Sequence, residues 1–156
     1  MKKPRVLFVC TYRGARGMIA EKLTEKLAPG KIEVYSAGFE PGIIGKLPIE
    51  IMKEIGIDLP KEAAKSVFAR YKDKEVFDYV ITLCSVATTE QCPIFMTNVD
   101  MLYAREAKRF SWSIPDFMNI KGTEEEKKNE ARKIRDQIKD KLLEFLSQLD
   151  IEVVES

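Results

Sequence analysis

The sequence contains no histidine, and this absence removes several kinds of functional site. Without an imidazole there is no Cys-His dyad, no Ser-His-Asp triad and no His-ligated metal. We therefore expect no metal site and no cofactor. A nucleophile in this chain has to be activated by other groups, such as cationic side chains or backbone N–H groups.

Cysteine and long apolar stretches are also scarce. The chain has three cysteines, and an odd number leaves one unpaired in any static disulfide scheme. No apolar run approaches the roughly 18 residues that cross a bilayer. The apolar stretch after the basic start covers only residues 6–10, which is too short for a signal peptide. We expect a cytoplasmic protein whose thiols are kept reduced and serve chemistry more than crosslinking.

Neither sign of charge is in excess, since 26 Lys and Arg stand against 25 Asp and Glu. This balance argues against nucleic acid and membrane surfaces as partners. At 156 residues, with 45% apolar and 33% charged residues, the composition is that of a globular domain. We see no linker, repeat or low-complexity tract, and we predict one domain over residues 1–156.

Apolar patterns alternate between strand-like and helix-like periods along the chain. Such alternation predicts an α/β fold with a parallel sheet, whose ligands bind beyond the carboxyl ends of the strands. The expected elements are a strand at 5–9, a helix ending near 27, a strand at 31–35, a helix at 47–55, a short helix at 61–70, a strand at 76–83, a weaker strand at 108–112 and a long amphipathic helix at 123–149.

The segment between the first strand and the first helix carries the main candidate site. Five residues separate Cys10 from Arg16, in the pattern C-x5-R. Backbone N–H groups and the positive end of a helix at such a loop can hold a tetrahedral oxyanion, and Arg16 can grip two of its oxygens. The same field would favour thiolate at Cys10 and lower its pKa. The simpler interpretation is a small buried cysteine at a strand end. The expected oxyanion-binding residues are Thr11, Tyr12, Arg13, Gly14, Ala15 and Arg16.

At this point the sequence resembles a known family. Val6-Leu-Phe-Val-Cys10 followed by Arg16 is similar to the low-molecular-weight protein tyrosine phosphatases and to the thioredoxin-linked arsenate reductases that share their fold. The resemblance continues through residues 18–21, 34–38, 52–58, 80–84, 92–94, 122–127 and 135–136. It implies a three-layer α/β/α, flavodoxin-like domain with a four-stranded parallel sheet.

The resemblance to the reductases also implies a relay of three cysteines. Cys10 would attack arsenate, Cys84 would attack Cys10 and release arsenite, and Cys92 would then attack Cys84. Thioredoxin would reduce the resulting disulfide, and each exchange needs a thiolate within reach of the next sulfur. The other interpretation is that Cys84 is a core cysteine at a strand end and that Cys92 is incidental.

A candidate acid follows the tryptophan in Trp112-Ser-Ile-Pro-Asp116. The segment resembles the W-x-x-D-D-P of the reductases, which implies that Asp116 protonates the departing oxygen. The other interpretation is an ordinary turn aspartate after a proline.

Several positions depart from the pattern C-T-G-N-S-C-R-S that the family usually shows. Gly17 stands where a serine hydroxyl normally stabilises the thiolate, and Arg13 replaces an asparagine that helps hold the loop. Tyr12 replaces a glycine, which raises the question of a positive φ. These departures leave two other functions open. One is a phosphatase that hydrolyses phosphate monoesters through a Cys10 phosphoenzyme; the other is a non-enzymatic oxyanion-binding or redox-sensing protein.

Overall fold

The computed structural model describes residues 3–12, 15–40, 44–61, 69, 76–83, 107–117 and 120–154, without the side chains of residues 11, 12, 39 and 40. The elements in chain order are β1 (Arg5–Tyr12), α1 (Ala15–Leu27), β2 (Glu33–Glu40), α2 (Lys46–Lys53), β3 (Tyr79–Thr82), β4 (Lys108–Ser111) and α5 (Glu124–Gln148). Within the described residues, strands and helices therefore occur where the apolar patterns predicted them.

The four strands form one parallel sheet in the order β2-β1-β3-β4. Phe8 in β1 is paired with Ser36 of β2 on one side and with Ile81 of β3 on the other. The predicted α/β fold with a parallel sheet is confirmed. Because the strand order reverses between β1 and β3, their carboxyl ends open a crevice there, the usual position of ligands in such sheets.

Several boundaries differ from the sequence-based ones; β3, for example, spans only Tyr79–Thr82 of the predicted 76–83. Both β1 and β2 run further than predicted, because parallel pairing continues to Cys10 with Gly38 and Tyr12 with Glu40. Cys10 is therefore inside β1 and not its last residue. Helix α2 ends at Lys53, two residues early, and Gly56 follows with a φ of 79° that favours glycine. The helix predicted at 61–70 lies almost wholly outside the described residues.

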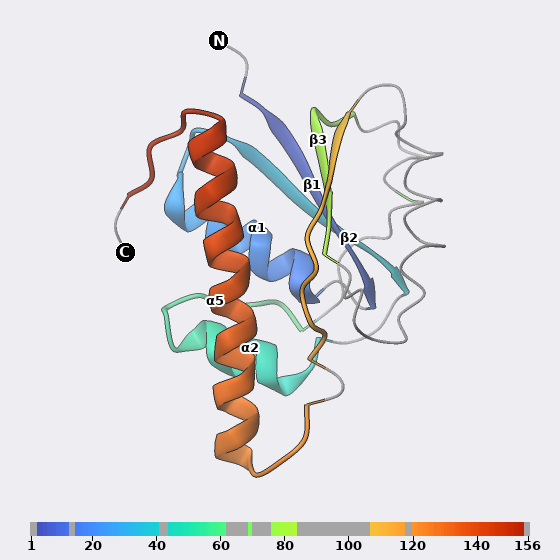
Figure 1. Cartoon of the computed structure of the whole chain (residues 1–156), viewed down its shortest axis with the longest axis vertical. Coiled ribbons are helices and arrows are strands. Elements are labelled where there is room, and N and C mark those ends of the chain that lie inside the picture. Colours follow the sequence, from blue (N-terminus) through green and yellow to red (C-terminus); the bar gives the residue numbers. More distant parts are fainter. Residues whose placement is uncertain are drawn as a thin grey trace.

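Helices α1, α2 and α5 lie together against one face of the sheet (Figure 1). Helix α5 packs on α1 and α2 through an apolar stripe that the sequence predicted, and only Leu149 of that stripe is partly exposed. On the other face of the sheet Leu7, Val9 and Val80 are also fully buried. Burial of both faces is what a three-layer arrangement requires. The buried residues of α5 are Ala131, Ile134, Ile138, Leu142, Phe145 and Leu146.

The ends of α5 and α2 are fixed by polar contacts. Thr123 and Glu126 form a reciprocal capping box, in which the Thr123 hydroxyl accepts from the Glu126 N–H at 3.2 Å. Arg132 donates from Nε and Nη2 to the Glu54 carboxylate, and Arg135 donates to the Ile51 carbonyl at 2.9 Å. These contacts hold the start of α5 over the end of α2.

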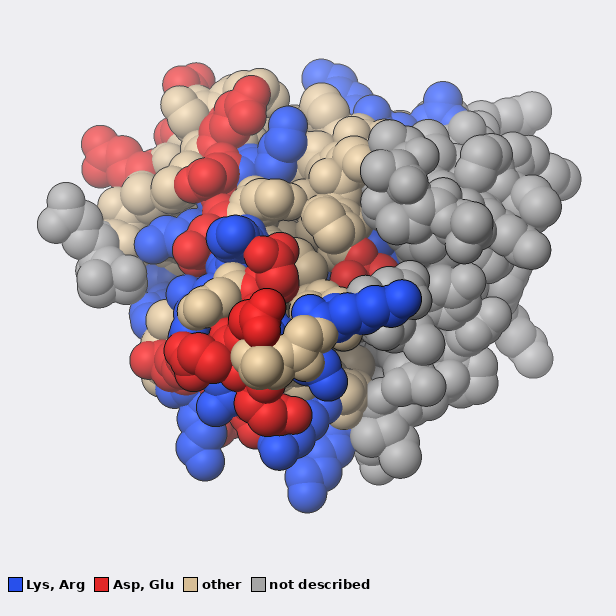
Figure 2. All heavy atoms as spheres, turned by 60° about the horizontal axis from the view of Figure 1, so that its bottom comes forward, with Lys and Arg blue, Asp and Glu red and all other residues tan. Residues whose placement is uncertain are grey.

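Charges of both signs are mixed over the face that carries α2 and the beginning of α5, and no patch of one sign dominates there (Figure 2). This agrees with the even balance of the sequence. None of the helices in the described part of the chain combines the length and the apolar character needed to cross a membrane.

Candidate active site

Cys10 lies in β1 two residues before the strand ends, and its side chain is fully buried. The backbone N–H groups of Arg16 and Gly17 donate hydrogen bonds to its sulfur. These N–H groups belong to the first turn of α1, where no helical carbonyl is available to accept from them. The strand and the helix thus bring a thiol against the positive end of a helix, as the sequence predicted.

The pKa of the Cys10 thiol is raised above its ordinary value, and the largest cause is burial. The Arg16 guanidinium and the two N–H groups act in the opposite direction, while the charge of Asp116 raises the pKa further. The predicted lowering of this pKa is therefore wrong for the site as the structure shows it. The reason is that burial destabilises the thiolate by removing it from water. This effect is larger than the stabilisation of the thiolate by the Arg16 cation and the two N–H groups.

Arg16 is a buried arginine beside Cys10, with only 1% of its surface exposed. Its Nη1 donates to the backbone carbonyl of Ile114 at 2.9 Å, across 98 positions of sequence. A guanidinium is buried only where hydrogen bonds and charge partners compensate it. The candidate anion clamp is thus also joined to the segment that follows β4.

That segment, residues 112–117, carries Asp116 toward Cys10. The Trp112 N–H donates to the Thr82 carbonyl at 2.8 Å, which continues the alignment of β4 along β3. The Trp112 ring lies 6.1 Å from the ring of Phe8, and Ile114 is buried in the same core. Asp116 is partly buried and close enough for its charge to act on the Cys10 sulfur. The structure therefore brings together Cys10, Arg16 and Asp116, three residues proposed from the sequence.

Other predicted site residues are described in part or not at all. Ala15 is the first residue of α1, and the backbones of Thr11 and Tyr12 belong to β1, while Arg13 and Gly14 lie outside the described residues. Tyr12 does not have a positive φ, since Asp150 is the one non-glycine residue with that conformation in the described ranges. The resolving cysteines proposed from the resemblance, at positions 84 and 92, also lie outside the described residues.

Gly17 has a packing role that the sequence analysis missed. A Cβ built at this position would lie 3.2 Å from the Phe8 carbonyl oxygen and 3.5 Å from Cβ of Ser36. The first turn of α1 therefore sits against β1 more tightly than a side chain would allow without a shift. The family serine is absent, and backbone N–H groups contact the sulfur at this position. The Ile114 carbonyl was missed as well, because a backbone acceptor leaves no signal in the sequence.

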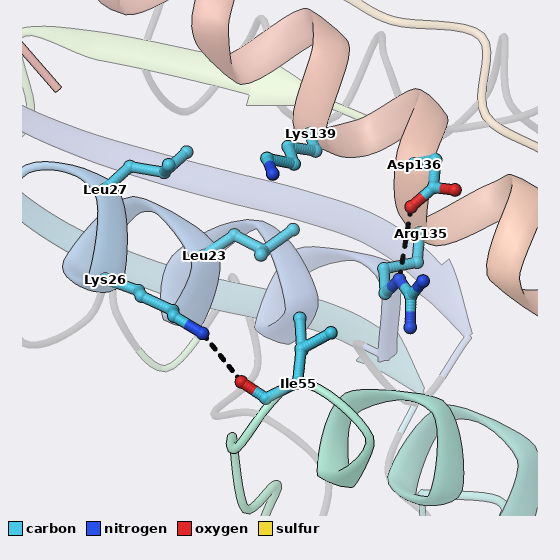
Figure 3. A pocket seen from close by; sticks show the side chains of 7 residues that line it. All are labelled: Leu23, Lys26, Leu27, Ile55, Arg135, Asp136 and Lys139. Atoms are coloured by element: carbon cyan, nitrogen blue, oxygen red, sulfur yellow. Dashed lines mark hydrogen bonds and ion pairs between the residues drawn. The ribbon is translucent and has the colours of Figure 1, made fainter. Parts of the chain in front are cut away.

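A hollow of about 110 Å³ lies between α1, α5 and the turn after α2, away from Cys10 (Figure 3). Lys26 donates to the Ile55 carbonyl at 2.6 Å, and Arg135 forms an ion pair with Asp136. Lys26, Arg135 and Asp136 thus already have partners within the protein. The hollow is lined by Leu23, Lys26, Leu27, Ile55, Arg135, Asp136 and Lys139. In the described ranges no three Cys, Asp or Glu side chains gather as a metal site would need.

The raised pKa of Cys10 has a measurable consequence. In reduced protein without anions, we expect alkylation of Cys10 by iodoacetamide to reach half its maximal rate above the pH of a free thiol, about 8.5. Because the folded state holds this proton more tightly, its stabilising contribution is complete below that pH and is lost as the pH rises through the raised pKa. Peptide mass spectrometry resolves Cys10 from the other two thiols. A midpoint at or below about pH 8.5, that of a free thiol, would contradict the prediction.

The chain is similar to known proteins over nearly its whole length. The sequence pattern of the family described as low molecular weight phosphotyrosine protein phosphatase matches residues 5–155. A curated arsenate reductase of Oceanobacillus iheyensis is 31% identical over 148 residues, covering 93% of this chain and 96% of that protein.

Solved structures show the same fold. An arsenate reductase in its oxidised state has a TM-score of 0.72 at 23% identity, covering 93% of this chain and 98% of its own. A thioredoxin-dependent arsenate reductase of Corynebacterium glutamicum has a TM-score of 0.64 at 23% identity, covering 95% of this chain and 62% of its own. At these identities the structural likeness concerns the fold alone. The family pattern spans nearly the whole sequence, and the chain belongs to the low-molecular-weight phosphotyrosine protein phosphatase family.

Proposed function

We propose that this protein reduces arsenate to arsenite, with Cys10 as nucleophile and with Cys84 and Cys92 as resolving thiols. Thioredoxin is the proposed reductant that regenerates the enzyme. The main support for oxyanion chemistry is that Cys10, Arg16 and Asp116 lie close together at the carboxyl end of β1. The choice of arsenate is supported by the similarity to curated arsenate reductases over 93% of the chain.

In the first step the Cys10 thiolate attacks arsenic, and one oxygen leaves as water after accepting a proton from Asp116. The Arg16 guanidinium and the first N–H groups of α1 oppose the negative charge of the oxyanion. The thiol has to lose its proton before it attacks, and its burial makes this costly. The Arg16 cation beside the sulfur reduces that cost, because it stabilises the thiolate.

In the second step the Cys84 thiolate attacks the Cys10 sulfur, and arsenite departs with the electron pair of the sulfur–arsenic bond. Two thiolates are oxidised to a disulfide, and arsenic gains two electrons. Cys92 then attacks Cys84 and frees Cys10, and the dithiol of thioredoxin reduces the last disulfide. One described contact supports the first of these exchanges: the Leu83 N–H donates to the Val9 carbonyl at 2.8 Å, and these residues directly precede Cys84 and Cys10.

A phosphatase remains the second candidate, favoured by the description of the family to which the chain belongs. The same three groups would form a Cys10 phosphoenzyme, which water then hydrolyses with Asp116 as base. That reaction consumes no electrons and needs no second thiol. The two functions therefore differ in whether turnover depends on a reductant.

The test is NADPH consumption by the wild-type protein with thioredoxin, thioredoxin reductase and arsenate. We expect arsenate-dependent oxidation of one NADPH for each arsenite formed, and little hydrolysis of an aryl phosphate. Hydrolysis of the ester without arsenate reduction would replace the proposal with the phosphatase. Silence in both assays would leave an oxyanion-binding or redox-sensing protein as the function.

A further inference from the structure

We propose that Arg16 is also a positioning residue, which holds residues 112–117 against the start of α1 and so presents Asp116 to Cys10. The inference rests on the proposed function only where it assigns Asp116 the role of proton donor. This inference is based on the hydrogen bond from Arg16 Nη1 to the Ile114 carbonyl, because that bond joins the start of α1 directly to residues 112–117. Arg16 thereby links the first turn of α1 to the segment that carries the acid.

The position of this bond makes it suited to that role. Ile114 lies two residues before Asp116, and the carbonyl that Arg16 contacts belongs to the peptide bond of Ile114 and Pro115. Proline fixes its own φ near −65°, so few backbone rotations separate the fixed carbonyl from the Asp116 side chain. Fixing that carbonyl therefore limits where the carboxylate can lie relative to the sulfur.

The bond is also strong for a single contact. Its donor is a cation, its acceptor is a carbonyl, and both groups are shielded from water, since Arg16 and Ile114 are each 1% exposed. Charge-assisted hydrogen bonds in such surroundings exceed neutral ones in strength. Without Arg16 the Ile114 carbonyl would lose a charged donor, and the segment would have to open for water to replace it.

Trp112 provides a reporter inside the same segment. It is the one tryptophan of the chain, it is 7% exposed, and its ring packs against Phe8 and Phe145. Opening of residues 112–117 would admit solvent to the indole. Fluorescence and amide exchange can therefore follow the segment in the absence of arsenate and of any turnover.

The experiment compares wild type with Arg16→Met and Arg16→Lys in reduced, anion-free buffer. Methionine fills the buried space and donates no hydrogen bond. Lysine can still donate one bond to the Ile114 carbonyl, but it lacks the planar fork that grips two oxygens. For Arg16→Met we expect amide exchange in residues 112–117 to accelerate about tenfold or more, the factor that loss of a charge-assisted bond gives. Acrylamide quenching of Trp112 should rise with it.

For Arg16→Lys we expect exchange and quenching close to wild type, together with loss of the thermal stabilisation that phosphate or arsenate gives. Arg132→Met, which removes a partly exposed arginine of α5, is the matched control and should leave residues 112–117 unchanged. Exchange in α5 peptides separates local opening from global destabilisation. Unchanged exchange and quenching in Arg16→Met would overturn the proposal and show that burial of Trp112 and Ile114 alone holds the segment.

A second measurement needs no variant. In wild-type protein at neutral pH, NMR should show a slowly exchanging Arg16 Nη proton with a scalar coupling to the Ile114 carbonyl carbon. Absence of a protected Nη proton would overturn the proposal even if Arg16→Met fails to fold. None of these readouts depends on arsenate reduction, so failure of the proposed function would be seen separately in the NADPH assay.

Discussion

Cys84→Ser and Cys92→Ser are both expected to abolish steady-state arsenate reduction, but they should stop the relay at different points. With Cys84→Ser no thiolate attacks the Cys10 adduct, so no arsenite is released. With Cys92→Ser, Cys84 still completes the first exchange, so each chain releases one arsenite and stops as a Cys10–Cys84 disulfide. Counting arsenite per chain in a single turnover without small thiols distinguishes these outcomes.

Cys10→Ser is the control for this pair, because it removes the nucleophile and should give neither adduct nor arsenite. Mass spectrometry after non-reducing digestion should identify the Cys10–Cys84 disulfide in the Cys92→Ser protein. The expected stoichiometry follows from the two-electron balance, since one arsenite requires two thiolates. Full turnover in both resolving-cysteine variants would contradict the relay and favour a reaction that uses Cys10 alone.

Asp116→Asn should lower kcat by about 10² to 10⁴, the usual contribution of a positioned general acid. The amide has nearly the shape of the carboxyl but cannot give up a proton to the departing oxygen. We expect KM to change little, because the proposed anion clamp is Arg16 with the N–H groups of α1. Steady-state kinetics of arsenate reduction measures both constants.

Asp136→Asn provides the same change at an exposed aspartate of α5, where the carboxylate pairs with Arg135. Its activity should remain within about twofold of wild type, since surface ion pairs contribute little. Alkylation of Cys10 should also respond to Asp116→Asn. Removing a negative charge that raises the pKa of the thiol shifts the alkylation midpoint to lower pH. An Asp116→Asn enzyme with more than half of wild-type kcat would contradict the role of this residue as acid.

Local sequence was sufficient for the architecture. The apolar run at 5–9 and the alternation at 31–35 predicted strands that the structure contains, because strand and helix periods are set by which side chains must be buried. The stripe of α5 was predicted for the same reason. Strand ends were not, since β1 and β2 are extended by pairing with each other, and pairing between distant segments is absent from a local pattern.

The chemistry of the site was likewise predictable from the sequence only in part. Residue types and spacing identified Cys10 and Arg16 as candidates. A thiol and a guanidinium beside a helix start can bind an oxyanion, and this pattern is local in the sequence. The direction of the Cys10 pKa shift was decided by tertiary structure, since burial depends on everything packed around the sulfur. So was the bond from Arg16 to the Ile114 carbonyl, whose partners lie 98 positions apart. Every residue has a backbone carbonyl, and only the folded chain determines which carbonyl accepts a hydrogen bond from a buried arginine.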